Sequence, residues 1–220
     1  YVGRFGCGYG DRHRLTLTSL TAMTPYTFGV VANCPTTVSD TVVVNFATAC
    51  AAMVSLPFNE TFDASSATRN CWHLVSMNTG NEIGTNNGMG FYTVDGREVL
   101  RFSSYSNQGG SNDYNQYGFS PLLDVSSAAT FLNVSVTYAT YSSSNTLYFG
   151  YVTPTDTIWD PTGYTTSGSS DWQTHTFVIP ATATQLAVNY YGNYSYYAWI
   201  DAVSVTEITG EYCYPVTNLT

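Results

Sequence analysis

The sequence predicts an all-β protein whose main part is a two-sheet antiparallel β-sandwich. Short runs of alternating apolar and polar residues are separated by clusters of Gly, Ser, Asn and Asp, which is the pattern of strands joined by turns. No segment shows a sustained apolar period of 3.6 residues, so we expect little helix. Tyr, Thr and Val, which favour strands, are abundant. Successive strands without helices between them indicate packed antiparallel sheets.

The N-terminal segment has the spacing of a β-sandwich corner. Apolar residues alternate on both sides of a turn at Pro25: Leu15, Leu17 and Leu20 before it, and Tyr26, Phe28 and Val30 after it. We therefore expect a strand over residues 15–20 and a second strand that returns antiparallel to it. In such corners a Tyr hydroxyl reaches back to the backbone a few residues upstream, and Tyr26 is placed for this contact.

Leu20, Thr24 and Tyr26 form the pattern L-x-x-x-T-x-Y, which resembles the fibronectin type III module. The usual form of that module carries Pro or Gly where this chain has Ala22. The resemblance covers residues 1–50, with a last strand at 42–46, and includes only the C-terminal half of the module. It implies that residues 1–50 are a partial fibronectin type III domain, so that the chain begins inside a domain of a longer modular protein.

A short apolar linker, residues 51–55, leads to a second and longer β segment. Its strands are recognised by their period of two, near residues 99–103, 132–138, 147–151, 177–179, 186–190 and 197–205. Polar clusters at residues 107–113, 142–145 and 165–171 separate these runs.

An ordered set of motifs gives the second segment a resemblance of its own. The set consists of FNETFD at 58–63, Cys71-Trp72, SPLLDV at 120–125, LYFGYV at 147–152, Trp172 and WIDAV at 199–203. It resembles the MAM-like, cleaved-adhesin or choice-of-anchor domains of surface and secreted proteins of Bacteroides–Porphyromonas group bacteria. The resemblance implies a jelly-roll domain over residues 56–208, located outside the cell or on the bacterial surface. It also implies neighbouring modules of the same parent chain, and residues 209–220 look like the start of a following fibronectin-type module.

The charge of the chain excludes some partners. Its six basic residues are all Arg, it has no Lys, and 15 acids give a formal net charge of −9. Binding to nucleic acid depends on clustered basic groups, so nucleic acid and anionic membranes are poor partners. No apolar run approaches the roughly 20 residues that cross a bilayer, so we expect no membrane insertion.

Five cysteines favour disulfides over a metal site. Their spacing fits no zinc motif. Cys7 and Cys34 flank the expected N-terminal strand pair at the same end, which predicts a Cys7–Cys34 bond. For Cys50 the candidates are Cys71 and Cys213. Exported β modules commonly use disulfides, with reduced and buried thiols as the alternative.

The sequence contains no recognisable catalytic motif. There is no nucleophile elbow, HExxH or P-loop, and His13, His73 and His175 lie in none of these contexts. Glu60 and Asp201 lie on the first and last strands of the segment, which are neighbours in jelly rolls. Carboxylates there suit a structural Ca²⁺ ion, with Asn59 and Asp63 as further ligands. Unbound surface acids are an equal alternative, and a catalytic pair of the glycosidase kind is a weaker one. The family often has a second acid where this chain has Ala202.

Aromatic residues beside polar loops form the second set of candidates. We expect ligand contacts from Tyr105, Tyr114, Tyr117, Asn112, Asp113, Gln116 and Trp159. Aromatic rings pack on sugar rings while amides and carboxylates bind hydroxyls, and the same residue types also recognise proteins. The alternative is that these tyrosines are ordinary residues of a half-buried sheet.

These observations predict a non-catalytic extracellular module that binds carbohydrate or a host surface protein. Two alternatives stay open. The first is a structural spacer, and the second is an accessory domain of a secreted protease or glycosidase whose catalytic unit lies elsewhere.

Overall fold

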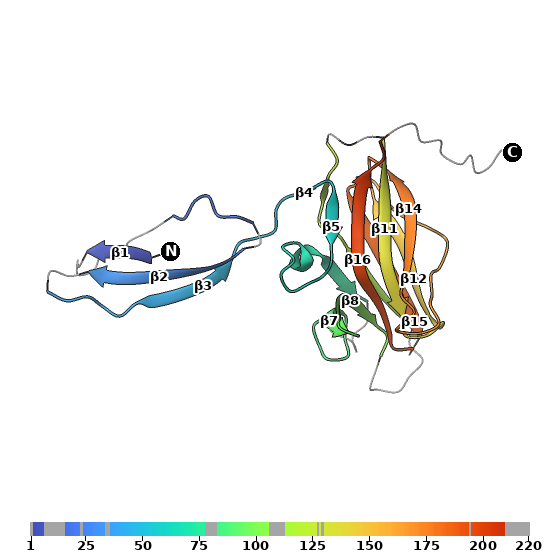
Figure 1. The fold of residues 1–220 in the computed structure, drawn as a ribbon, viewed down its shortest axis with the longest axis horizontal. Helices are drawn as coiled ribbons and strands as arrows, with labels where there is room; N and C mark the ends of the chain where they lie inside the picture. Colours follow the sequence, from blue (N-terminus) through green and yellow to red (C-terminus); the bar gives the residue numbers. More distant parts are fainter. Residues whose placement is uncertain are drawn as a thin grey trace. The chain divides into compact units, whose positions relative to one another are not determined.

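The computed structural model describes residues 2–6, 16–22, 24–33, 36–77, 83–105, 113–126, 128, 130–193 and 195–209. The chain divides into two compact units, Tyr1–Ala51 and Ala52–Thr220, and each is described by itself. The described residues are almost entirely strands and turns, with one short 3₁₀ helix, η1 (Arg69–Cys71) (Figure 1). The all-β prediction is therefore confirmed. None of the described helical residues forms a segment long and apolar enough to cross a membrane.

The first unit is a three-stranded sheet that contains the predicted corner. Its strands are β1 (Val2–Gly6), β2 (Pro25–Asn33) and β3 (Val42–Ala47), with β2 in the middle and antiparallel to β3. The backbone N–H of Thr21 donates a hydrogen bond to the Tyr26 hydroxyl over 2.9 Å. The Tyr26 ring stacks on Phe46 of β3 with a centroid separation of 5.8 Å. This is the corner contact that the sequence predicts.

The strand expected over residues 15–20 is wrong. Residues 16–20 form no strand, and Ser19 has a left-handed φ of 60°, which a strand does not allow. Backbone groups near this segment bond to side chains instead of to a neighbouring strand, since the Thr48 hydroxyl donates to the Thr21 carbonyl over 2.6 Å. The strand that pairs with β2 on the side away from β3 is β1, and β1 and β2 are parallel rather than antiparallel. Because Val42, Val43 and Val44 are each more than half exposed, β3 encloses no core of its own, and the fibronectin type III assignment stays a prediction.

The second unit is a β-sandwich of two main sheets. One sheet has the order β14-β11-β16-β8-β7, with β5 also paired to β16, and the other has the order β13-β12-β15-β9-β6. The six-stranded sheet contains β5 (Phe58–Glu60), β7 (Gly90–Val94), β8 (Arg97–Ser103), β11 (Phe131–Thr140), β14 (Gln173–Pro180) and β16 (Tyr197–Glu207). The five-stranded sheet contains β6 (His73–Ser76), β9 (Asp113–Phe119), β12 (Asn145–Val152), β13 (Thr157–Trp159) and β15 (Gln185–Asn193). A small parallel pair joins β4 (Val54–Ser55) to β10 (Leu123–Asp124).

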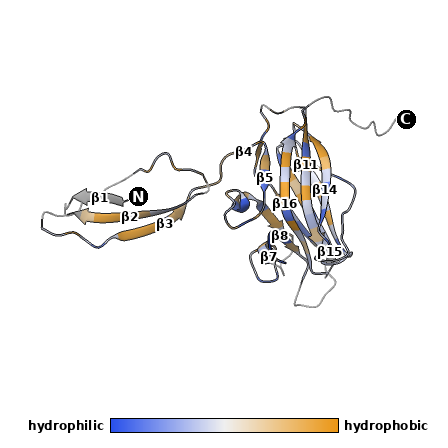
Figure 2. Ribbon diagram, viewed as in Figure 1, coloured by the Kyte–Doolittle hydropathy of each residue, from blue (hydrophilic) through white to orange (hydrophobic). Residues whose placement is uncertain are grey.

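The core lies between the two sheets because the strands alternate in polarity, as Figure 2 shows for β11, β14 and β16. Val134 and Val136 of one sheet and Phe149 and Val188 of the other belong to the same buried cluster. Side chains of a strand alternate between its two faces, so the intervening residues point outward. The outward face of the five-stranded sheet is where the candidate site lies.

A buried polar group connects strands of both sheets inside the sandwich. The Tyr190 hydroxyl lies 2.6 Å from Asn145 Oδ1 and 2.7 Å from the Ser104 hydroxyl. Asn145 Nδ2 in turn donates to the Ser195 carbonyl over 2.6 Å. Tyr190, Ser104 and Asn145 are all fully buried, so these hydrogen bonds satisfy groups that water does not reach.

Candidate functional site

Four rings form a continuous row on the outer face of the five-stranded sheet, which we call the aromatic strip. His73 stacks on Phe119 at 6.1 Å between ring centroids, Phe119 on Tyr117 at 6.4 Å, and Tyr117 contacts Trp159 at 6.1 Å. These residues come from three strands, β6, β9 and β13. The sheet register places His73 opposite Phe119, which fixes one end of the strip.

The floor of the strip is made of small residues. Gly150 of β12 and Ala187 of β15 lie in the same row as Phe119, and Trp159 lies opposite Gly150. A Cβ atom at Gly150 would be 2.8 Å from Cε3 of Trp159, so the indole occupies the space above this glycine. Ala187 is 1% exposed although it belongs to the outer face, so the neighbouring rings cover it. The Trp159 ring can therefore reach diagonally across the sheet to Tyr117.

A shallow, open hollow of about 460 Å³ adjoins the strip. Its lining includes His73 and Phe119 together with Leu122, Val152, Thr157 and Gln185. Amide side chains lie beside Tyr117 on the same face: Asn189 is its partner across the ladder, and Asn189 Nδ2 donates to the Gln116 carbonyl over 3.2 Å. Rings with adjacent amides offer both stacking surface and hydroxyl partners.

The structure brings together two of the predicted ligand residues, Tyr117 and Trp159. Gln116 points the other way: it is fully buried, its Oε1 accepts from the Ser103 backbone N–H over 2.7 Å, and its Nε2 donates to Ser76. The reason is the period of two, because neighbours along a strand face opposite sides of the sheet. Gln116 is therefore a structural residue, and its prediction as a ligand contact is wrong.

Other predicted residues lie elsewhere or beyond the described atoms. Tyr105 belongs to a separate cluster of tyrosine rings, with Tyr196 at 5.2 Å and Tyr197 at 6.2 Å. Asp113 and Tyr114 lie in β9, but their side chains are outside the described part of the structure, and Asn112 lies outside the described residues.

Phe119 and His73 are strip residues that the sequence reasoning missed. Phe119 follows Tyr117 at a spacing of two, a signal in the sequence that could have placed the two rings on one face. His73 has no such signal, because its place depends on the pairing of β6 with β9.

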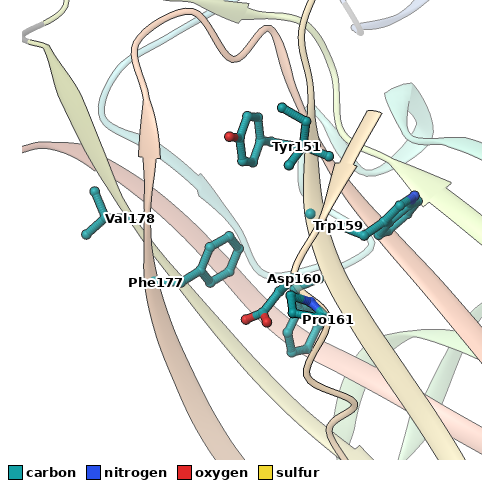
Figure 3. Close-up of a pocket in the computed structure, with 9 residues that line it drawn as sticks. Tyr151, Trp159, Asp160, Pro161, Phe177 and Val178 are labelled. Atoms are coloured by element: carbon teal, nitrogen blue, oxygen red, sulfur yellow. The ribbon is translucent and has the colours of Figure 1, made fainter. Parts of the chain in front are cut away.

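A second cavity, of about 240 Å³, opens at the edge of the sandwich between β13 and β14. Tyr151, Ile158, Asp160, Pro161 and Phe177 are among its lining residues (Figure 3). Trp159 also lines this cavity, and Figure 3 shows its indole pointing away from Phe177 and Val178 on the far wall.

The Asp160 carboxylate, which lies beside that cavity, accepts hydrogen bonds from neighbouring residues. Although partial burial opposes it, hydrogen bonds from the Thr162 N–H and the Tyr164 hydroxyl lower the pKa of Asp160. Burial and this bond to Asp160 raise the pKa of Tyr164 to about 12. His175 Nε2 is buried, has no hydrogen-bond partner and lies 4.0 Å from Asp160 Oδ2. Burial lowers the pKa of His175, with Asp160 acting in the opposite direction.

The four residues predicted to bind Ca²⁺ do not converge. Glu60 faces the core opposite Val203, is 1% exposed, and accepts hydrogen bonds from the Phe62 N–H at 2.8 Å and from the hydroxyls of Ser66 and Thr68 at 2.6 Å. Asp201 lies at a bulge in the β11–β16 ladder, where its Oδ2 is 2.6 Å from Nη1 of Arg97.

Glu60 and Asp201 therefore belong to opposite faces of the six-stranded sheet, and Asp63 Oδ2 accepts from the Thr61 hydroxyl over 2.6 Å. Asn59 neighbours Glu60 on β5 and, by alternation, faces the other way. Among the described residues no three His, Cys, Asp or Glu side chains form a metal-binding group. The predicted set does not fit a shared Ca²⁺ site, and what remains of the calcium prediction is the single buried carboxylate of Glu60.

Cys50 and Cys71 are both disulfide-bonded. The predicted Cys7–Cys34 pair and the alternative partner Cys213 lie outside the described residues.

Comparison with known proteins bears on the fold of the second unit. No family model matches the sequence, and no curated protein matches it either. The K3 cleaved adhesin domain of Lys-gingipain from Porphyromonas gingivalis is similar in structure, with a TM-score of 0.50, 15% identity, and coverage of 68% of this chain and 98% of that chain.

Two carbohydrate-binding modules are also among the similar structures. CsCBM6-3 from Clostridium stercorarium, in complex with cellobiose, has a TM-score of 0.40 and 14% identity, covering 71% of this chain and 98% of that one. TmCBM61, in complex with β-1,4-galactotriose, has a TM-score of 0.44 and 8% identity, covering 62% and 88%. The likeness to the K3 domain shows that the second unit shares the β-sandwich fold of a cleaved adhesin domain.

Proposed function

We propose that the second unit is a non-catalytic glycan-binding module, displayed outside the cell or on a bacterial surface, and that the aromatic strip is its binding face. The observation that carries this proposal is the continuous row of rings from His73 to Trp159 over a floor of Gly150 and Ala187. Small residues beneath the row let the Trp159 ring lie across the sheet. A ring in that position offers its outer surface to the C–H face of a sugar.

The surroundings of the strip fit sugar recognition. Tyr117, Phe119 and Trp159 are half-buried, so their positions are fixed by packing before any ligand arrives. The amides of Asn189 and Gln185 lie beside them on the same face and can exchange hydrogen bonds with hydroxyl groups. The adhesin-like fold is consistent with a role in adhesion.

Binding to immobilised oligosaccharides tests the proposal. Residues 1–220 are applied to a glycan array, and the affinity for any hit is measured by titration calorimetry for the native chain and for Trp159→Ala, Tyr117→Ala and Trp159→Phe. Loss of one stacking ring should weaken binding at least tenfold, while Trp159→Phe retains part of the affinity. A spacer would bind no glycan, and that result would refute the proposal.

The cluster of Tyr105, Tyr141, Tyr196 and Tyr197 is the second candidate surface. Tyr141 and Tyr196 are 47% and 41% exposed, and their rings lie 4.6 Å apart. Exposed tyrosines of this kind also serve protein recognition. Tyr141→Ala therefore distinguishes the two surfaces: glycan binding through the strip is unaffected by it, whereas binding of a host surface protein through the cluster is lost.

A further inference from the structure

Each arginine side chain of the second unit binds a carboxylate or backbone carbonyls within that unit. Nη1 of Arg69 lies 2.9 Å from Oε2 of Glu98, and Nη1 of Arg97 lies 2.6 Å from Oδ2 of Asp201. Arg101 donates to the carbonyls of Gly88 and Asn86, with distances of 2.7 to 3.0 Å, and lies over the rings of Tyr92 and Tyr197. The chain has no Lys, and these three are the only Arg residues between Ala52 and Thr220.

Two of these cations belong to the opposite side of the sandwich from the aromatic strip, and the third is held at the sheet edge. Arg97 and Arg101 alternate with the core residue Leu100 on β8, so they face outward from the six-stranded sheet. Arg69 lies over Phe91 of β7, which pairs with Leu100 and faces the core, so Arg69 lies at the inner edge of this sheet, where Glu98 binds it. Within the strip, which contains no Arg or Lys, His73 has the only basic side chain. The binding face therefore offers no permanent cation to an acidic ligand.

Negative groups, in contrast, lie next to the strip. Asp160 follows Trp159 directly, with its carboxylate turned from the strip towards Thr162 and Tyr164, and the exposed Asp156 precedes Thr157 in the same hairpin. The Thr162 N–H and the Tyr164 hydroxyl bind the Asp160 carboxylate and favour its ionised form. Three arginines stand against twelve acids between residues 52 and 209. The field of the whole unit is therefore negative near neutral pH.

We infer that the strip takes uncharged glycans and rejects glycans that carry carboxylate or sulfate groups, an inference that rests on the proposed function. An anionic sugar on the strip would lose hydration without gaining a cationic partner, which is costly. It would also be repelled by acids within a Debye length, about 8–10 Å in physiological salt. A neutral sugar meets neither cost, since its hydroxyls donate to amide or carboxylate oxygens.

Paired neutral and acidic polysaccharides test the inference. The chain is run in gels that contain β-1,4-galactan, xylan or β-glucan, and in gels that contain polygalacturonate, alginate or heparin, each at 50 and 500 mM NaCl. We expect retardation by at least one neutral polymer at both salt concentrations, and by none of the acidic ones. Retardation by an acidic polymer that disappears in Trp159→Ala overturns the inference and leaves the proposed function standing. Migration unaffected by all six polymers overturns both.

A cation placed at the strip tests the cause of the selectivity. Thr157 lines the hollow on the outer face of the five-stranded sheet, so Thr157→Arg adds a positive charge beside Trp159. Thr174→Arg is the matched control, because Thr174 is exposed on β14 in the other sheet and pairs with Thr137 there. We expect Thr157→Arg, and not Thr174→Arg, to gain at least fivefold in retardation by polygalacturonate at 50 mM NaCl. An equal gain in both variants, or a gain in neither, contradicts the local account.

Discussion

The substitution Gly150→Ala tests whether the close pairing of β12 and β13 holds Trp159 on the binding face. An added Cβ atom would lie 2.4 Å from the Ile158 carbonyl oxygen and 2.8 Å from Cε3 of Trp159. Ordinary carbon–oxygen contacts are about 3.3–3.6 Å, so the β12–β13 hairpin must open by about 1 Å. The obstacle is backbone of the paired strand, which cannot rotate away as a flexible side chain could.

The expected cost follows from overpacking. Insertion of a methyl group into a closely packed site costs about 1–3 kcal/mol. In a domain of this size, each kcal/mol lowers the melting temperature by roughly 2–4 °C. We therefore expect Gly150→Ala to melt about 4–8 °C lower if the cost is about 2 kcal/mol. Trp159 must also leave the floor of the strip, so glycan affinity should fall together with stability.

Gly168→Ala is the control. No atom lies within 4 Å of an added Cβ at Gly168, and its φ is not in the left-handed region. Such a change stabilises by about 0.4–1 kcal/mol, because it restricts the unfolded chain. Urea and thermal unfolding followed by circular dichroism would measure both variants. Equal stability of the Gly150 and Gly168 variants would refute the reasoning about the Gly150 floor.

Three further predictions concern the interior of the second unit. Tyr190→Phe should lower the free energy of unfolding by about 1–3 kcal/mol in urea titrations, because Asn145 and Ser104 lose a buried partner, whereas Tyr148→Phe on the outer face should change it little. Burial raises the pKa of Tyr190 to about 12, and burial with the Asp160 hydrogen bond does the same for Tyr164. The stabilisation that these two neutral hydroxyls contribute is therefore full below pH 10 and is lost as the pH rises towards 12. Urea unfolding from pH 8 to 12 should show a falling free energy of unfolding, and Tyr190→Phe should make that fall shallower. A free energy of unfolding that does not change over this range would contradict the prediction. The buried Glu60 carboxylate accepts three hydrogen bonds, so we expect Glu60→Gln to lower the free energy of unfolding by about 1–3 kcal/mol, equally in Ca²⁺ and in EDTA. A melting temperature that is higher in Ca²⁺ than in EDTA for the native chain, and equal for Glu60→Gln, would contradict this and would assign a bound ion to Glu60.

Local periodicity predicted much of the fold. The alternation around Leu147 and Phe149, for example, marks both the strand and its buried face. The Tyr26 corner was also visible, because the contact spans only five residues along the chain. The N-terminal strand was misplaced for a reason that periodicity does not contain: Thr48 and Tyr26 satisfy the backbone of the segment before Pro25 without a ladder.

The candidate site was predicted only in part because register decides which residues meet. Tyr117 and Trp159 are 42 positions apart in the sequence and meet through the pairing of β9, β15, β12 and β13. Gln116 is one residue from Tyr117, yet it faces the core. Asp201 could not be assigned from the sequence, because a single bulge and the position of Arg97 determine its partner. The composition of the loops and strands indicated which residue types form the candidate site. The strand register determined which of these residues lie on the outer face of the five-stranded sheet.

The central claim is that Trp159 receives a sugar ring on the outer face of the five-stranded sheet. Indole N–H signals in ¹H–¹⁵N spectra report on it directly, since Trp72 and Trp199 are only 5% and 3% exposed and serve as internal references. During titration with a neutral oligosaccharide, the Trp159 indole signal should shift in a saturable manner while those of Trp72 and Trp199 stay in place. Saturable binding that leaves the Trp159 signal unmoved would contradict the account.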